Sequence, residues 1–198
     1  MVYHHEKLYA PSDYKDESNF LKTLDSEVQK KRLKESVKDI ENDKANSQEV
    51  IPENKNNIVI PRQKELTQTY FLAEELALRQ LEIELNTVIK RQSGLKIGRE
   101  LLAFDGVGTD GDNLVIVEIK YTRTGVISID SLRKFYIHCL KLRNYYYAKQ
   151  NIVCIIAIVH EGRIFDISDK VREIFDDSIS PKVFYYNINE LKSKFGIE

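Results

Sequence analysis

The chain has 198 residues, of which 42% are hydrophobic and 31% are charged, and its formal net charge is −1. This length suits one domain with a full hydrophobic core and at most a small appendage. A nearly neutral chain has no overall basic excess that would indicate nucleic acid, so such a partner has to be inferred from local patches.

No membrane partner is expected, because the longest apolar run, residues 152–159, is less than half the length of a bilayer span. No signal peptide opens the sequence, and the two cysteines, Cys139 and Cys154, fall inside apolar patterns. This pattern suits two buried thiols in a reducing compartment, so we expect a cytoplasmic protein.

Residues 1–60 are expected to form a charged helical or flexible arm with a linker, followed by one domain over 61–198. The arm carries ten Lys or Arg against twelve Asp or Glu and no glycine. A weak apolar stripe predicts a helix over about 18–41, and the polar residues 42–57 are typical of a linker. The arm is either a solvated charged helix or a docking segment for a second copy or another protein.

A strong helical pattern covers residues 63–92, and Gly94 is placed to end it. The apolar residues recur at intervals of three, four and seven: Tyr70, Ala77, Leu81, Leu85 and Val88. Glu74 lies on the same stripe. It either reaches solvent from the edge of the stripe or has a function in the core.

A β-hairpin is predicted next, because the apolar runs 101–104 and 114–119 flank a segment rich in Gly, Asp and Asn. Residues 106–111 match the G-x-G-x-x-G pattern of dinucleotide-binding turns, but that turn has to open a helix and here a strand follows. The segment also starts like a calcium loop, but Leu114 stands where an oxygen ligand belongs. A hairpin turn explains it better than either.

Three charged residues interrupt this hairpin. Asp105 sits where the first strand ends, and Glu118 and Lys120 lie two apart in the second strand. They therefore project to one face, while Val117 and Ile119 project to the other. Charges in so apolar a run are costly unless a partner stabilises them.

A basic helix is predicted over residues 127–147. Its apolar side comprises Ile129, Leu132, Tyr136, Leu140 and Tyr147. Its other side carries Lys134, His138, Lys141, Tyr145 and Lys149. Between residues 128 and 151 five Lys or Arg face one acid, a local charge of +4. With Arg123 just before it, this stripe is either a track for a phosphate backbone or a solvated helix face.

The C-terminal part alternates short strands and helices. We expect strands over 151–160, 164–167 and 183–186, a helix that Ser168 caps and that ends at 175, and a helix over 189–195. The whole order predicts an α/β (α+β) fold with a central mixed sheet flanked by helices.

Together, Asp105 and Glu118-Ile119-Lys120 resemble the active-site motif of the PD-(D/E)xK nuclease superfamily, which has a restriction-endonuclease-like fold. The resemblance covers about residues 65–190, and Glu74 matches the helix glutamate that many members add. Phe104 replaces the proline of the motif. The resemblance implies a catalytic set of Glu74, Asp105, Glu118 and Lys120, and metal ligation by Asp105, Glu118, Glu74 and the backbone carbonyl of Ile119.

The residue types also fit this chemistry on their own. Converging carboxylates bind a hard cation, so we expect Mg²⁺, with Mn²⁺ as an alternative. Lys120 can orient the attacking water or stabilise the transition state. The expected function is a metal-dependent nuclease acting on DNA, with RNA not excluded, in restriction, phage defence, transposition or repair. The alternatives are a silent nuclease-like fold that binds nucleic acid or assembles with a partner, and a purely structural ion network.

The clustered acids also lead to an expectation about stability. Because Asp105 and Glu118 carry like charges, we expect that replacing Asp105 by Ala is neutral or stabilising in metal-free buffer.

Overall fold

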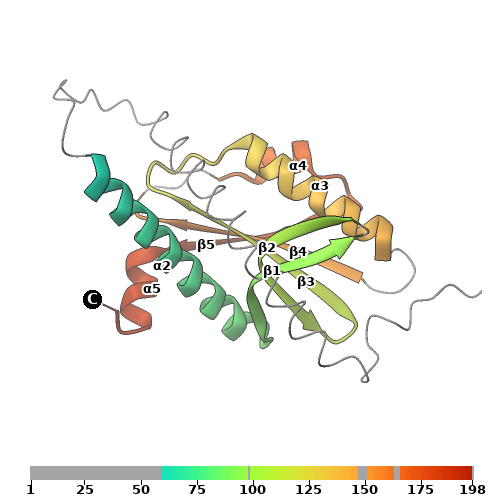
Figure 1. The fold of residues 1–198 in the computed structure, drawn as a ribbon, viewed down its shortest axis with the longest axis horizontal. Coiled ribbons are helices and arrows are strands. Elements are labelled where there is room, and N and C mark those ends of the chain that lie inside the picture. Colours follow the sequence, from blue (N-terminus) through green and yellow to red (C-terminus); the bar gives the residue numbers. More distant parts are fainter. Residues whose placement is uncertain (1–58, 98, 147–150, 163–165, 198) are drawn as a thin grey trace, which may run out of the picture.

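The computed structural model describes residues 59–97, 99–146, 151–162 and 166–197, and the expected arm helix over about 18–41 lies outside these residues. The described part is an α+β fold in which helices flank a mixed five-stranded sheet (Figure 1). Its elements are α2 (Val59–Leu85), β1 (Ile89–Ile97), β2 (Glu100–Asp110), β3 (Asn113–Thr122), α3 (Ile129–Tyr146), β4 (Asn151–His160), α4 (Ser168–Ile174), β5 (Lys182–Asn187) and α5 (Ile188–Lys194). The expected sheet with helices on both sides is confirmed.

The sheet has the strand order β1-β2-β3-β4-β5. The first three strands form an antiparallel meander, and β3, β4 and β5 pair in parallel. The parallel step from β3 to β4 crosses over through α3, as such a connection requires. α2 and α5 pack on one face of the sheet, and α3 and α4 pack on the other (Figure 1).

Helix α2 ends earlier than its apolar pattern predicts. It stops at Leu85, and Asn86 then takes a left-handed conformation with φ 48°. Asn is one of the few residues that adopt this conformation readily at a helix C-terminus. Val88, expected on the buried stripe, is 80% exposed, and Gly94, expected to end the helix, lies inside β1.

The hairpin is confirmed, but its turn is shorter than expected. β2 continues to Asp110, so that only Gly111 and Asp112 separate the two strands. Gly106 lies inside β2 where β1 and α2 both approach closely: an added Cβ would lie 2.5 Å from Ile89 Cγ2 of β1 and 2.8 Å from Leu78 Cδ2 of α2.

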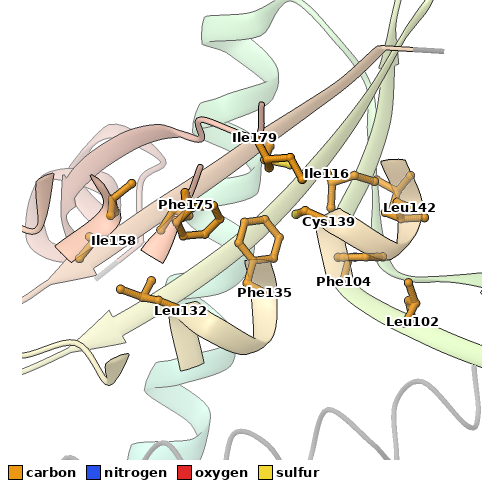
Figure 2. Packing of buried hydrophobic residues seen from close by; sticks show 14 of the residues in the cluster. Leu102, Phe104, Ile116, Leu132, Phe135, Cys139, Leu142, Ile158, Phe175 and Ile179 are labelled. Carbon is orange, nitrogen blue, oxygen red and sulfur yellow. The ribbon is translucent and has the colours of Figure 1, made fainter. Parts of the chain in front are cut away.

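The core between the sheet and α3 is mainly aliphatic, and three phenylalanine rings lie within it (Figure 2). Phe135 packs against Phe104 and Phe175, with ring centroids 6.4 and 6.2 Å apart. The fully buried residues of α3 are Leu132, Phe135, Cys139 and Leu142. This corrects the expected apolar side: Ile129 is 39% exposed, Tyr136 and Leu140 are partly buried, and Tyr147 lies outside the described residues. The side of α3 that packs on the sheet is therefore rotated about the helix axis relative to the side that the sequence predicts.

The C-terminal elements largely follow the prediction. β4 is buried on both faces, and β5 and α5 lie where they are expected. The expected cap of α4 is wrong, because Ser168 lies inside the helix and donates its N–H to Asp166 Oδ1 at 2.9 Å. Residues 163–165 lie outside the described part, and 166–167 are not a strand. No helix in the described ranges is long and apolar enough to cross a membrane.

Candidate active site

Glu118 and Lys120 project from β3 toward α3. The odd-numbered residues Val117 and Ile119 belong to the cluster under α2, so the even-numbered positions face the other side. Lys120 Nζ lies 2.8 Å from Glu118 Oε1, and the two side chains are only 10% and 17% exposed. The expectation that these charges require a partner is thus met by the pair itself.

Asp105 joins this pair at the point where β2 and β3 stop pairing. The ladder between the strands ends at Gly106 and Val117. Beyond it, Asp105 Oδ2 accepts the backbone N–H of Ile119 at 2.5 Å, both groups being buried. The carboxylate therefore binds the peptide that lies between Glu118 and Lys120. This brings the three predicted residues to one place.

The opposite side of β2 is also interrupted here. β1 pairs with β2 at Arg91 and again at Ser93, but Gln92, which faces Asp105 in the register, has φ 47° and makes no ladder pair. A non-glycine residue in this conformation is uncommon and marks local strain. The backbone is thus irregular on the β1 side of Asp105 as well as at the end of the β2–β3 ladder.

The hydrogen bond that Asp105 accepts changes the expected effect of Asp105→Ala on the stability of the protein. The like-charge argument predicts that Asp105→Ala is neutral or stabilising. In the structure, however, the carboxylate satisfies a buried N–H, and leaving such a donor unsatisfied costs about 1–3 kcal/mol. We therefore expect this variant to be destabilised.

Cys139 and Cys154 belong to the hydrophobic cluster on the α3 side of the sheet, and both are free and buried, as expected. Burial raises the pKa of the Cys139 thiol far above its ordinary value, and contact with Cys154 and the negative charge of Glu118 act in the same direction. Cys139 is one of the buried residues of α3 that pack toward the sheet. Its neighbour in α3, His138, packs its ring edge-on against Phe104, with centroids 5.8 Å apart.

Glu74 is buried, as its place on the helical stripe indicates, with 4% of its surface exposed. It belongs to α2, which covers the sheet face opposite to Glu118 and Lys120. Within the described residues no group of three or more His, Cys, Asp or Glu side chains could hold a metal ion. The structure therefore does not place Glu74, Asp105 and Glu118 in one metal-binding group, and the role of Glu74 remains a prediction.

The predicted ligands nevertheless are of a type that suits a hard divalent cation. They are the carboxylates of Asp105 and Glu118 and the carbonyl of Ile119, and Mg²⁺ is usually held by one or two carboxylates, several waters and substrate phosphate. The backbone N–H of Ile119 is held by its hydrogen bond to Asp105 Oδ2. The set offers oxygen ligands only, as Mg²⁺ and Mn²⁺ prefer.

Comparison with known proteins adds little. No family model matches the chain, and no curated protein matches it. One solved structure, described as the protein of unknown function AF1548, is similar at a TM-score of 0.42 and 13% identity, covering 63% of this chain and 67% of the other. A likeness this weak carries no argument about the site.

The residues expected to bind nucleic acid are not one continuous exposed stripe. Lys134 and Tyr145 are exposed, whereas His138 is partly buried against Phe104. Lys141 Nζ binds both carboxylate oxygens of Glu100 at 2.6 and 2.8 Å. Lys149 lies outside the described residues.

The expected nucleic-acid residue Arg123 is also engaged in an ion pair. Its Nε lies 3.1 Å from Glu161 Oε2, and Glu161 in addition accepts a hydrogen bond from the Tyr121 hydroxyl. The acids that pair with these cations, Glu161 and Glu100, are not among the predicted site residues. Their partners lie about 40 positions away in the chain, so no local spacing could indicate them.

Proposed function

We propose that the protein is a metal-dependent nuclease that hydrolyses phosphodiester bonds of DNA and that its core is restriction-endonuclease-like. The observation that carries this proposal is the meeting of Asp105 with the Glu118–Lys120 pair where β2 and β3 separate. Two acids and a lysine in a largely buried place are costly to maintain, and such groups concentrate where charge is used in catalysis.

Each residue of this group has a role that its position supports. Asp105, Glu118 and the Ile119 carbonyl would hold Mg²⁺ or Mn²⁺. When bound, the cation supplies an activated water and offsets charge on the phosphate. Lys120 contributes a positive charge that stabilises the transition state or orients the attacking water. Asp105 additionally fixes the peptide between Glu118 and Lys120, which keeps both side chains on the α3 face.

A second candidate function is a binding or assembly module in which the same group is a structural ion network. The contact of 2.8 Å between Lys120 and Glu118 favours this reading, because the two charges already neutralise each other. The two candidate functions predict different effects on DNA cleavage when the charge of Glu118 or Lys120 is removed by a substitution of similar shape.

The test is cleavage of plasmid DNA by Glu118→Gln and Lys120→Met in Mg²⁺ and in Mn²⁺, with and without excess EDTA. Glu82→Gln is the matched control, because Glu82 forms a partly buried ion pair with Arg91 at 2.5 Å on the other face of the sheet. We expect the wild type and the control to cleave only with metal, and both site variants to be inactive while remaining folded by circular dichroism.

Activity near the wild-type level in either site variant would refute the catalytic assignment. No metal-dependent cleavage by the folded wild type, on linear, nicked, branched or single-stranded DNA and on RNA, would instead support the binding module.

A further inference from the structure

Most of the exposed large hydrophobic side chains lie on one short stretch of the chain. In the described residues seven such side chains are exposed, and four of them lie between positions 126 and 145: Val126 at 40%, Ile129 at 39%, Ile137 at 49% and Tyr145 at 41%. This stretch follows directly on the strand that carries Glu118 and Lys120, and it includes α3. Exposed apolar residues gathered in this way mark an interaction surface more often than isolated ones do.

On α3 the apolar residues alternate with cations. Lys134, Ile137, Lys141 and Tyr145 follow steps of three, four and four, so they share one face of the helix. We call these four residues the α3 outer face. It lies away from the buried residues of the helix and spans about 16 Å along the helix axis. The ring of Tyr145 packs edge-on against Tyr146 with centroids 5.1 Å apart, which limits its motion.

The charge of the helix and its place next to the site narrow the class of partner. α3 carries four Lys or Arg and one acid in a chain whose net charge is −1, although Lys141 is paired with Glu100, so a bound strand would have to compete with that carboxylate. Such a helix attracts an anionic polymer. Glu118 and Lys120 occupy positions of β3 that face α3, so a polymer bound along α3 lies on the same side of the sheet as the site.

The alternation of cations and apolar side chains on α3 favours single-stranded over double-stranded nucleic acid as the ligand. A duplex presents mainly phosphates to a helix that lies along its backbone, and apolar side chains between the cations gain nothing there. The bases of an unpaired strand offer flat faces on which aromatic and aliphatic side chains stack, while cations bind the phosphates. We propose that the α3 outer face binds the unpaired bases of a single-stranded or branched nucleic acid, which rests on the proposed nuclease function and specifies its substrate.

The test measures binding by fluorescence anisotropy in EDTA, where no metal-dependent cleavage can occur. The probes are a labelled 20-nucleotide oligo(dT) strand and a labelled duplex of the same length. The first variant combines Ile137→Ser with Tyr145→Ser. Its matched control combines Ile83→Ser with Val88→Ser, two residues that are 59% and 80% exposed at the far end of α2 and just after it.

We expect the first variant to lose about tenfold in affinity for the single strand, to change little on the duplex and to keep its salt dependence. The control variant should match the wild type on both probes. A third variant, Lys134→Gln with Lys141→Gln, should weaken both complexes and flatten their salt dependence.

Equal loss on both probes, or no loss on either, would overturn the inference. So would a change of oligomeric state in the first variant by light scattering without selective loss of the single strand, because the face would then hold a second copy. Selective loss without metal-dependent cleavage by the wild type would refute the nuclease and leave this surface standing. Metal-dependent cleavage by the wild type, without selective loss of single-strand binding in the first variant, would support the nuclease and refute the binding role of the α3 outer face.

Discussion

Replacing Asp105 by Ala is expected to destabilise the metal-free protein, because one buried hydrogen bond loses its acceptor. Asp105 is 7% exposed and Ile119 is 1% exposed, and the carboxylate accepts the Ile119 N–H at 2.5 Å. Water cannot easily replace an acceptor at such a depth, so the cost is about 1–3 kcal/mol. For a chain of this size the melting temperature should fall by roughly 2–10 °C.

Asp105→Asn is the matched variant, because an amide oxygen can still accept from Ile119 while the negative charge is gone. It should keep most of the wild-type stability in urea and thermal unfolding at neutral pH without metal. Hydrogen exchange at the Ile119 amide should be fast in the Ala variant and slow in the Asn variant. If Asp105→Ala were as stable as the wild type or more stable, repulsion between the acids would outweigh the hydrogen bond, and the reasoning would be refuted.

Three further variants test other parts of the structure. Gly106→Ala should lose about 1–3 kcal/mol in urea unfolding, because its Cβ would lie 2.5 Å from a neighbouring side chain, whereas Gly162→Ala, in open space, should not. The pKa of Glu82 is lowered by hydrogen bonds from a guanidinium, so Glu82→Gln should be less stable than the wild type at neutral pH, and the difference should vanish as pH falls well below 4.5. Glu100→Gln releases Lys141, so in EDTA it should tighten duplex binding and steepen the salt dependence by about 0.9; an unchanged slope would mean that Lys141 makes no phosphate contact.

The elements with clear periodicity could be predicted from the sequence, and one edge strand could not. The hairpin, α3, β4, β5 and α5 each carry an apolar run or a periodic apolar pattern, and all lie close to where they are expected. β1 has only three Leu or Ile among its nine residues. It is held by backbone pairing to β2 and by the ion pair of Arg91 with Glu82, and neither leaves a local pattern.

One residue of the sequence, Asn86, indicates the early end of α2, but the apolar spacing around it favours a longer helix. Leu85 and Val88 continue the interval of three and four, so apolar spacing alone predicts a helix that continues past Leu85. Asn86 takes the left-handed conformation that often follows a helix, and a β-branched residue then leads into a strand. The end of this helix depends on the backbone conformation of Asn86, which the spacing of apolar residues does not indicate.

The meeting of Asp105, Glu118 and Lys120 could be predicted because adjacent strands of one hairpin bring them together. The hydrogen bond from Ile119 to Asp105 could not, since it exists only because the ladder between the strands ends one residue earlier. Glu74 belongs to α2, and spacing within one helix does not determine which side of the sheet that helix covers.

The binding of a divalent cation at Asp105 and Glu118 is the measurement that tests the proposed active site most directly. Isothermal titration of the metal-free protein with Mn²⁺ should show binding that Asp105→Asn and Glu118→Gln each weaken at least about tenfold, since each removes an anionic ligand. Glu82→Gln, with its acid on the other face, should bind as the wild type does. A wild type that binds no Mn²⁺, or site variants that bind it unchanged, would contradict the assignment of these acids to a metal site.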